Sequence, residues 1–344
     1  MEDQKQQAPS PEGFFINVQR RDDPVSEVTE LDAVASARAY GEIVVRGPLF
    51  GFAAQRRGER PRWGLLGGMD TGYPQDARDE LNSFLWLKAK DGTDNHLERR
   101  ELLAAVATLE TEPVNAVSAW GTCYRIVRAD EFARIGGGRL EPPRPTDVDT
   151  GGWDGPQVRP ASRADGFVID HGAAVGLTEG LDRAGLQSLA YTSRRFPPDV
   201  LADSRRAVTT HPGLVLLPAA FRVMEHKGDA WSMVGEQHGT PQEARRSLVR
   251  YLTELLPVSG GTGEGDAGVY ARAAERFARQ RRPDELRVRG RCFQIVRVER
   301  MMRIGPDGPE TPRRSDTDIQ GPVRIRPAMD EWGNLTHGGP HPDR

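Results

Sequence analysis

Two stretches of the chain decide its fold because they are almost the same. Residues 121–128 read Gly-Thr-Cys-Tyr-Arg-Ile-Val-Arg, and residues 290–297 read Gly-Arg-Cys-Phe-Gln-Ile-Val-Arg. Each is followed by Arg-Ile-Gly, at 134–136 and at 303–305, and then by a Pro-Arg step and two aspartates. A pattern that returns in the same order along the chain predicts an internal duplication.

The likeness extends outward from these stretches. Trp63 corresponds to Trp231, 168 positions later (231 − 63), and Cys123 corresponds to Cys292, 169 positions later (292 − 123). A register that drifts so little across the chain is hard to produce by chance. The sequence therefore predicts two related units, each about the size of an ordinary domain.

We expect five segments along the chain. Residues 1–15 form a disordered N-terminus, 16–161 the first unit, 162–189 a connector, 190–328 the second unit and 329–344 a flexible C-terminal tail. The connector mixes glycines with apolar residues, which predicts a short ordered link. The two units would pack about a pseudo-two-fold axis, as a fused homodimer does, or stay apart as separate beads.

The composition is that of a globular protein. Hydrophobic residues make up 37% of the chain and charged residues 28%, and the formal net charge is −3. This balance argues against a generic nucleic-acid-binding surface, and no apolar run is long enough to span a bilayer. The N-terminus lacks the basic and apolar regions of a signal peptide. We therefore expect a cytoplasmic protein that binds neither nucleic acid nor membranes.

The first part of each unit predicts a short helix followed by an antiparallel meander. In the first unit an alanine-rich helix is expected at 32–40, with strands at 43–45, 50–54 and 62–66. Gly47-Pro48 predicts a turn between the first two of these strands. In the second unit the corresponding hairpin has strands at 221–225 and 230–234.

Two helices are expected to follow in each unit. The first begins at Pro74 or at Pro241, where a missing N–H costs nothing, and Thr240 is a candidate cap. Its inward face has apolar residues at helical spacing: Ala77, Leu81, Phe84 and Leu85 in one unit, and Ala244, Leu248, Tyr251, Leu252 and Leu255 in the other. The second helix is expected at 97–108, with Leu103, Val106 and Ala107 inward, and at 269–280.

Each unit ends in strands. The cysteine strands at 123–127 and 292–296 are expected to run into a short helical turn that ends at Gly136 or Gly305, and final strands are expected at 157–159 and 323–326. Strands, then helices, then strands indicate an α+β fold made of two tandem copies of one unit, an antiparallel sheet with helices.

Charged residues shared by both units are the candidate site. The set contains Arg128, Arg134, Arg144 and Asp147 in the first unit and Arg297, Arg303, Arg313 and Asp316 in the second, accompanied by Glu141, Asp149, Glu310 and Asp318. One interpretation is an arginine pocket for a phosphate or carboxylate ligand. The other, which the equal supply of acids favours, is an internal clamp that fixes the proline-rich segments to the sheet.

Other residues that could carry chemistry have structural interpretations. No histidine neighbours Cys123 or Cys292, so no base is placed to form a thiolate, and both thiols are expected in the core. Trp63 and Trp231 are expected in the core as well. The histidines are scattered and the Gly-rich run at 259–266 lacks the Gly-Lys-Ser/Thr of a phosphate loop, so no metal, cofactor or catalytic residue is predicted.

The second cysteine stretch continues from residue 290 to 316 as Gly-x-Cys-aromatic-x-Ile-Val-Arg, then Arg-Ile-Gly-Pro-Asp-Gly-Pro-Glu-x-Pro-Arg-x-Ser-Asp. This stretch resembles a function-unknown family of duplicated-domain proteins from streptomycetes and related actinobacteria. The resemblance implies an actinobacterial, cytoplasmic origin and no activity. The first unit departs from it at 137–140, where Pro-Asp-Gly-Pro is missing.

The sequence favours a non-enzymatic protein that recognises a protein partner or a small anionic ligand. The alternative is an enzyme of unfamiliar type, with arginines that hold an anionic substrate and an aspartate as acid or base, either Asp147 and Asp316 or Asp149 and Asp318. A third possibility is a regulatory protein whose interface is a sheet edge. The chain is expected to be a monomer built as a pseudo-dimer, or a homodimer.

Overall fold

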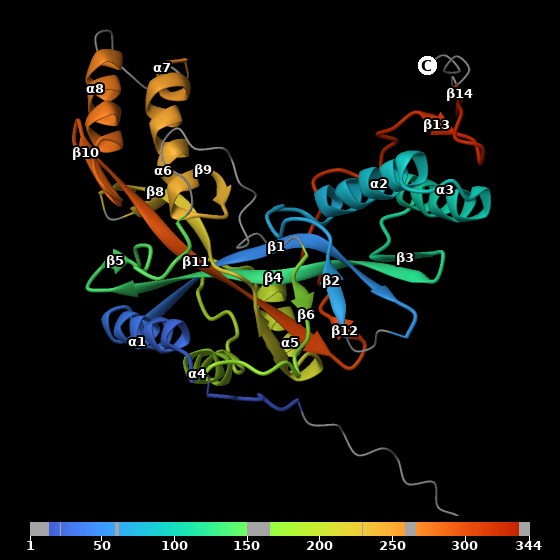
Figure 1. Ribbon diagram of the computed structural model, residues 1–344, viewed down its shortest axis with the longest axis horizontal. Coiled ribbons are helices and arrows are strands. Elements are labelled where there is room, and N and C mark those ends of the chain that lie inside the picture. The colour runs from blue at the N-terminus through green and yellow to red at the C-terminus, as the bar shows by residue number, and fades with distance from the viewer. Residues whose placement is uncertain are drawn as a thin grey trace, which may run out of the picture.

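One large antiparallel sheet runs through the molecule, with helices packed against it (Figure 1). The computed structural model describes residues 14–20, 22–58, 62–149, 166–228, 230–258 and 266–336. The sheet has 12 strands, and its main path is β6-β2-β1-β4-β11-β8-β9. The predicted α+β class is confirmed: helices and antiparallel strands share one fold. None of the helices in the described residues has the length and apolar character needed to cross a membrane.

The elements before residue 150 are α1 (Pro24–Ala39), β1 (Glu42–Arg56), β2 (Trp63–Leu65), α2 (Pro74–Asp91), α3 (His96–Thr111), β3 (Ala116–Ala119), β4 (Thr122–Gly136) and β5 (Arg139–Leu140). The described part of the expected connector contributes β6 (Val168–Ile169), which pairs with β2, and α4 (Leu177–Leu186).

The elements that follow are α5 (Pro198–Thr210), β7 (Gly213–Leu216), β8 (Ala220–Lys227), β9 (Ala230–His238), α6 (Pro241–Arg250), a π-helical turn (Tyr251–Leu255), α7 (Leu256–Val258), α8 (Ala267–Ala278), β10 (Glu285–Val288), β11 (Arg291–Gly305) and β12 (Gly308–Pro309). A separate two-stranded sheet joins β13 (Ala328–Met329) to β14 (Leu335–Thr336).

The two central strands β4 and β11 join the two ends of the sheet. They pair with each other over four residues, from Ala133 opposite Val298 to Asp130 opposite Met301. Beyond this crossing each strand pairs with its own neighbours, β1 on β4 and β7 and β8 on β11. One apolar core lies between the β1–β4 region and α2 and α3, and another between the β8–β11 region and α6 and α8.

The expected turn at Gly47-Pro48 is wrong, because β1 is one continuous strand. It pairs with β4 from Glu42 opposite Ile135 to Arg56 opposite Thr122. The register shifts between Val45 and Gly47, where Gly47 has a φ of 152°. A bulge therefore absorbs the Gly-Pro step without ending the strand.

The expected helical turns before Gly136 and Gly305 are also wrong. β4 and β11 remain extended up to these glycines. In each strand several consecutive residues are buried, which shows that both faces of the strand are covered. The expected strand at 323–326 is absent, and the nearest strand is β13. The expected strand at 157–159, Trp153 and the Gly-rich run up to residue 265 lie outside the described residues.

The predicted helices are confirmed with adjusted bounds. Ala77, Leu81 and Leu85 are fully buried on α2, and Thr240 caps α6 by accepting a hydrogen bond from the Glu243 N–H. α1 is longer than predicted, since it begins at Pro24 after its cap Asp23. Two inward assignments are wrong: Ala107 is exposed, and Leu255 is 53% exposed. The π-helical turn that contains Leu255 shifts the helical face at this point.

The C-terminal hairpin β13–β14 lies next to α2 and α3, which are far from it in the sequence (Figure 1). The Trp86 indole donates to the Pro327 carbonyl at 3.0 Å, and Arg99 donates to the Glu331 carbonyl at 3.1 Å. The Trp332 ring stacks on His96 with ring centroids 5.1 Å apart. The described part of the expected flexible tail thus makes specific contacts with the first half of the chain.

Candidate functional site

Each central strand carries an arginine two residues before an acid. On β4, Arg128 donates to Asp130 at 2.7 Å; on β11, Arg297 donates to Glu299. These side chains are almost completely buried. Buried charges of this kind are stable only when they are paired and hydrogen-bonded. Both pairs obtain further partners from segments that follow the strands.

The first of these segments, residues 310–318, is called here the C-terminal strap. Its Glu310 carbonyl accepts from the Arg128 backbone N–H at 2.9 Å, and its Asp316 carboxylate accepts from the Arg128 side chain at 2.9 Å. Arg313 pairs with Glu310 at 2.7 Å and reaches Asp130 at 3.6 Å. A strap that follows β11 is therefore fixed to β4.

The second segment, residues 141–149, is called the N-terminal strap, and it is fixed to β11. Its Glu141 carbonyl accepts from the Arg297 backbone N–H at 2.9 Å, and Asp147 accepts from the Arg297 side chain at 3.2 Å. Arg144 pairs with Glu141 at 2.6 Å and lies 3.6 Å from Glu299. The straps that follow the two central strands thus cross over to the opposite strand.

The far ends of both straps bind arginines on helices. Asp318 pairs with Arg78 of α2 at 2.7 Å, and Asp149 pairs with Arg245 of α6 at 2.7 Å. Both arginines are nearly fully buried. Each strap consequently ties a central strand to the helix that covers that strand.

Burial and the arginine partners have opposite effects on the pKa of the buried acids. Burial alone would raise the pKa of Asp130, but Arg128 and Arg313 outweigh it and the pKa is lowered. Burial alone would also raise the pKa of Glu299, but Arg297 and Arg134 outweigh it and this pKa is lowered. At Asp147 burial prevails over its arginine partner and the pKa is raised.

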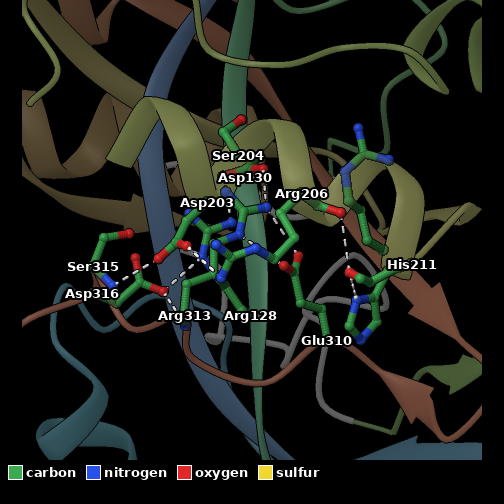
Figure 2. Close-up of polar contacts among 12 residues, drawn as sticks. Arg128, Asp130, Asp203, Ser204, Arg206, His211, Glu310, Arg313, Ser315 and Asp316 are labelled. Carbon is green, nitrogen blue, oxygen red and sulfur yellow. Dashed lines mark hydrogen bonds and ion pairs between the residues drawn. The ribbon is translucent and has the colours of Figure 1, made fainter. Parts of the chain in front are cut away.

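A tyrosine completes the network on β4. Tyr191, which precedes α5, donates its hydroxyl to Asp130 and receives a hydrogen bond from Arg128 at 3.2 Å. Burial, followed by the charge of Asp130, raises the pKa of Tyr191 above its ordinary value. The phenol therefore stays protonated and acts as a donor to Asp130 (Asp130 and Arg128 are drawn in Figure 2).

A cavity of about 200 Å³ lies beside this network, between α5 and the C-terminal strap. We call it the strap pocket. It is lined by the arginines Arg206, Arg313 and Arg314, by Thr210, Thr311 and His211, and by the acids Asp203 and Glu310. Figure 2 shows Arg128, Arg313 and Asp316 gathered under α5, with His211 and Glu310 at one side of the cluster.

The acids of the strap pocket are already engaged. Glu310 accepts from Arg313 at 2.7 and 3.0 Å, and Asp203 accepts from the Ser315 backbone N–H at 3.0 Å. Arg206 lies 3.3 Å from Asp203, but its side chain is 64% exposed. Burial lowers the pKa of His211, so this ring is neutral near pH 7. Cationic donors therefore remain available at the mouth of the pocket.

Buried donors without partners mark the same region. The Nη1 atom of Arg313 and the Oγ atom of Ser315 are buried and have no hydrogen-bond partner in the described part of the molecule. The side chain of Arg313 is only 6% exposed. Such orphaned donors are rare in folded proteins and call for an explanation.

The eight predicted site residues divide between two networks. Arg128, Arg313 and Asp316 meet on β4; Arg134, Arg144, Asp147 and Arg297 meet around Glu299 on β11. Arg303 stands apart, because it donates to the Gln187 and Leu189 carbonyls. Of the eight, only Arg313 lines the strap pocket.

The β4 network and the strap pocket also contain four residues that the sequence did not predict: Tyr191, Arg206, His211 and Arg314. A comparison of the two halves finds only residues that both share, and these four positions differ between the halves. The described residues also hold no group of three or more His, Cys, Asp and Glu side chains placed to bind a metal ion.

The model of a family of unknown function (DUF5954) matches residues 23–319. The chain belongs to this family. The matched span begins at Asp23, the cap of α1, and ends just after Asp318, so it covers the residues of both straps and of the strap pocket but not those of the hairpin β13–β14. No curated protein and no solved structure matches the chain. The predicted membership of a function-unknown family is confirmed.

Proposed function

We propose that the protein is a binding protein that recognises a small anionic ligand in the strap pocket. The observation that carries this proposal is the surplus of guanidinium groups there: Arg206, Arg313 and Arg314 against Asp203 and Glu310. Arg314 is exposed and takes part in no ion pair among the described residues. A guanidinium group binds a phosphate or a carboxylate through two parallel N–H···O hydrogen bonds. Thr311 adds a hydroxyl donor, whereas the Thr210 hydroxyl donates to the Arg206 carbonyl at 3.2 Å.

We further propose that the two halves are copies of one unit related by a pseudo-two-fold axis. The reciprocal contacts support this: Arg128 binds Asp316, and Arg297 binds Asp147. Within each strap, the arginine backbone N–H donates to the aspartate three residues later at 2.7 Å. A duplication that keeps these contacts in both directions would make the ion pairs part of the framework.

Under this proposal the second copy differs from the first in the side chains that line the strap pocket. The helix ends α1 and α5 correspond, since their C-caps Tyr40 and His211 have φ values of −127° and −130°. The pocket positions Arg206, Thr210, Thr311 and Arg314 then correspond to Ala35, Ala39, Pro142 and Pro145. The framework acids and arginine are kept while the lining gains polar and cationic groups, which supports a binding role for the second half.

The strap acids support binding better than acid–base catalysis. Asp147 and Asp316 each accept hydrogen bonds from a backbone N–H and from an arginine side chain. They belong to different networks, and each is already engaged by its own arginine partner. We propose that their role is to hold the straps in place.

We place this binding protein in the cytoplasm. Cys123 and Cys292 are free and partly buried. Free thiols are what a reducing compartment maintains.

The proposal is tested by ligand-induced stabilisation. Inorganic phosphate, citrate and a panel of nucleotides and sugar phosphates are added to the purified chain, and the shift in melting temperature is recorded. A ligand at about a hundred times its dissociation constant adds ~2.7 kcal/mol of apparent stability. We expect at least one such anion to stabilise the wild type, and the combined substitution R206A/R314A to abolish the shift.

The matched control is R205A, because Arg205 is the exposed neighbour of Arg206 on α5 and does not line the pocket. It should leave the shift unchanged. Equal stabilisation of the wild type and of R206A/R314A would place anion binding elsewhere. A complete lack of stabilisation by every anion tested would contradict the proposed ligand class.

A further inference from the structure

β9 forms one end of the sheet, and its outer edge at 230–234, called here the open edge, has no strand partner among the described residues. Among the described residues it pairs only with β8. The short strand β2 occupies the matching position after β1 in the first half, and there the outer edge is covered by β6. An uncovered edge presents unpaired N–H and C=O groups that can pair with another strand.

The register of the β8–β9 hairpin shows which backbone groups face outward. Lys227 and Ala230 are its closing pair, with two residues between them. In such a hairpin the closing pair exchanges hydrogen bonds, and narrow and wide pairs then alternate. Trp231 and Met233 therefore direct their N–H and C=O groups away from β8, toward the open side.

The open edge lacks the features that usually prevent pairing. The stretch Ala-Trp-Ser-Met-Val at 230–234 contains no charged residue and no proline. The Met233 side chain is 42% exposed, and the Trp231 side chain, on the same face, packs against the ring of His226 at 4.5 Å between centroids. The regular ladder ends after Val234, where Gly235 has a φ of 73° and the register shifts.

We propose that this edge pairs with β9 of a second copy of the chain. Antiparallel pairing about a two-fold axis at Ser232 would place Trp231 opposite the partner's Met233, and Met233 opposite the partner's Trp231. These are the residues whose backbone groups face outward, so about four main-chain hydrogen bonds would form. The two apolar side chains of each copy would cover those of the other, and no like charges would meet.

The self-complementary pattern is the argument for a second copy. An isologous contact needs a patch that fits itself after a two-fold rotation, and the centre of this strand meets that condition in both hydrogen bonding and side chains. The assembly stops at two copies, because the pairing occupies the β9 edge of both. The paired stretch is short, so we expect a dimer that dissociates on dilution.

Sedimentation velocity over a wide range of concentration tests the proposal on the full chain. We expect the wild type to shift from monomer to dimer as concentration rises, and M233K to remain monomeric. The control is V44K, since Val44 on β1 is also 42% exposed and lies away from this edge. A second variant, M233P, adds no charge, removes an outward N–H and no N–H that is bonded to β8, and should also abolish the dimer while the β8 ladder is kept.

A wild type that stays monomeric at every concentration would overturn the proposal and leave the edge to an extended segment of another protein. A dimer that persists in both M233K and M233P would equally overturn it. V44K that dissociates like M233K would show that the effect is not specific to β9. Circular dichroism and melting temperature establish that each variant is folded.

Discussion

Glu131 of β4 and Arg300 of β11 face each other as direct partners in the ladder that joins the two central strands. They are 169 positions apart (300 − 131), which is also the separation of Cys123 and Cys292 (292 − 123). If the halves are copies, as we propose, a two-fold axis would pass through this pair. An acid on one side and an arginine on the other would then be the point where the symmetry is broken.

The first prediction concerns the loss of Glu131. Arg222 grips this carboxylate with hydrogen bonds of 2.8 and 2.9 Å, and Arg46 lies 3.4 Å away. Burial lowers the pKa of the nearby Arg300 to about 10. The substitution E131Q would leave these arginines without their acid, and we expect a loss of roughly 3–5 kcal/mol in the free energy of unfolding.

R300M is the matched comparison at the partner position. Arg300 donates to the Met69 and Pro218 carbonyls and, at 2.8 Å, to the side-chain oxygen of Gln237 in the amide orientation that satisfies both ends of that group. It forms no ion pair among the described residues, and its Nε atom has no partner there. Replacing it with an apolar side chain removes a buried charge that no acid neutralises directly. We expect a much smaller loss than for E131Q, measured by urea denaturation of both variants. A larger loss for R300M would contradict this account of the central pair.

The second prediction concerns the reciprocal strap contacts. The Arg128–Asp316 pair and the Arg297–Asp147 pair are both nearly buried, at 2.9 and 3.2 Å. Double-mutant cycles, with each residue replaced alone and together, measure the coupling energy of each pair. We expect couplings of similar size, on the order of 0.5–3 kcal/mol, for the two pairs. A clear coupling in one pair and none in the other would argue against equivalent roles for the straps.

The third prediction concerns acid. The arginine partners lower the folded-state pKa of Asp130 and of Glu299. Groups with a lowered folded-state pKa add stability that is complete above their unfolded values, about 3.9 for Asp and 4.3 for Glu, and is lost as the pH falls through the folded values. The wild type should therefore lose stability steeply below about pH 4. In D130N, which is also less stable at neutral pH, the loss should be less steep.

The control for the acid experiment is D22N, because the Asp22 side chain is 83% exposed. It should follow the wild-type dependence of the unfolding free energy on pH. The raised pKa of Asp147 acts in the opposite direction, but it is common to all three proteins and cancels in the comparison. Equal acid slopes for D130N and the wild type would show that Asp130 does not supply this stability.

Sequence patterns predicted the parts of the fold that depend on local chemistry. The helical faces of α2 and α6, the Thr240 cap and the β8–β9 hairpin follow from residue spacing and turn residues. The extended course of β4 and β11 past residues 127 and 296 did not follow. Their mixed charged and apolar residues read as a helical turn until the crossing of the two strands, which buries both faces, is known.

The site was predictable only in part, for a related reason. Shared arginines and acids pointed to a clamp or a pocket, and the sequence could not show that the straps cross to opposite strands. Tertiary contacts such as Tyr191 with Asp130, or Asp203 with the Ser315 N–H, join segments that are far apart in the chain. The strap pocket lies where such segments meet. Four of its lining residues, Arg206, Thr210, Thr311 and Arg314, would correspond to alanine or proline in the first half under the proposed duplication.

The fourth prediction separates a buried leucine from an exposed one in the same helical region. Leu248 on α6 is fully buried in the core beneath α6 and α8, whereas Leu255 in the π-helical turn is 53% exposed. Helical spacing from the sequence placed both inward. L248A should cost about 2–5 kcal/mol of unfolding free energy, because it removes apolar contacts and leaves a cavity. L255A should change the free energy by less than about 0.5 kcal/mol, as surface substitutions do. Urea denaturation of the two variants measures both values, and a comparable loss for L255A would mean that the turn packs inward in solution.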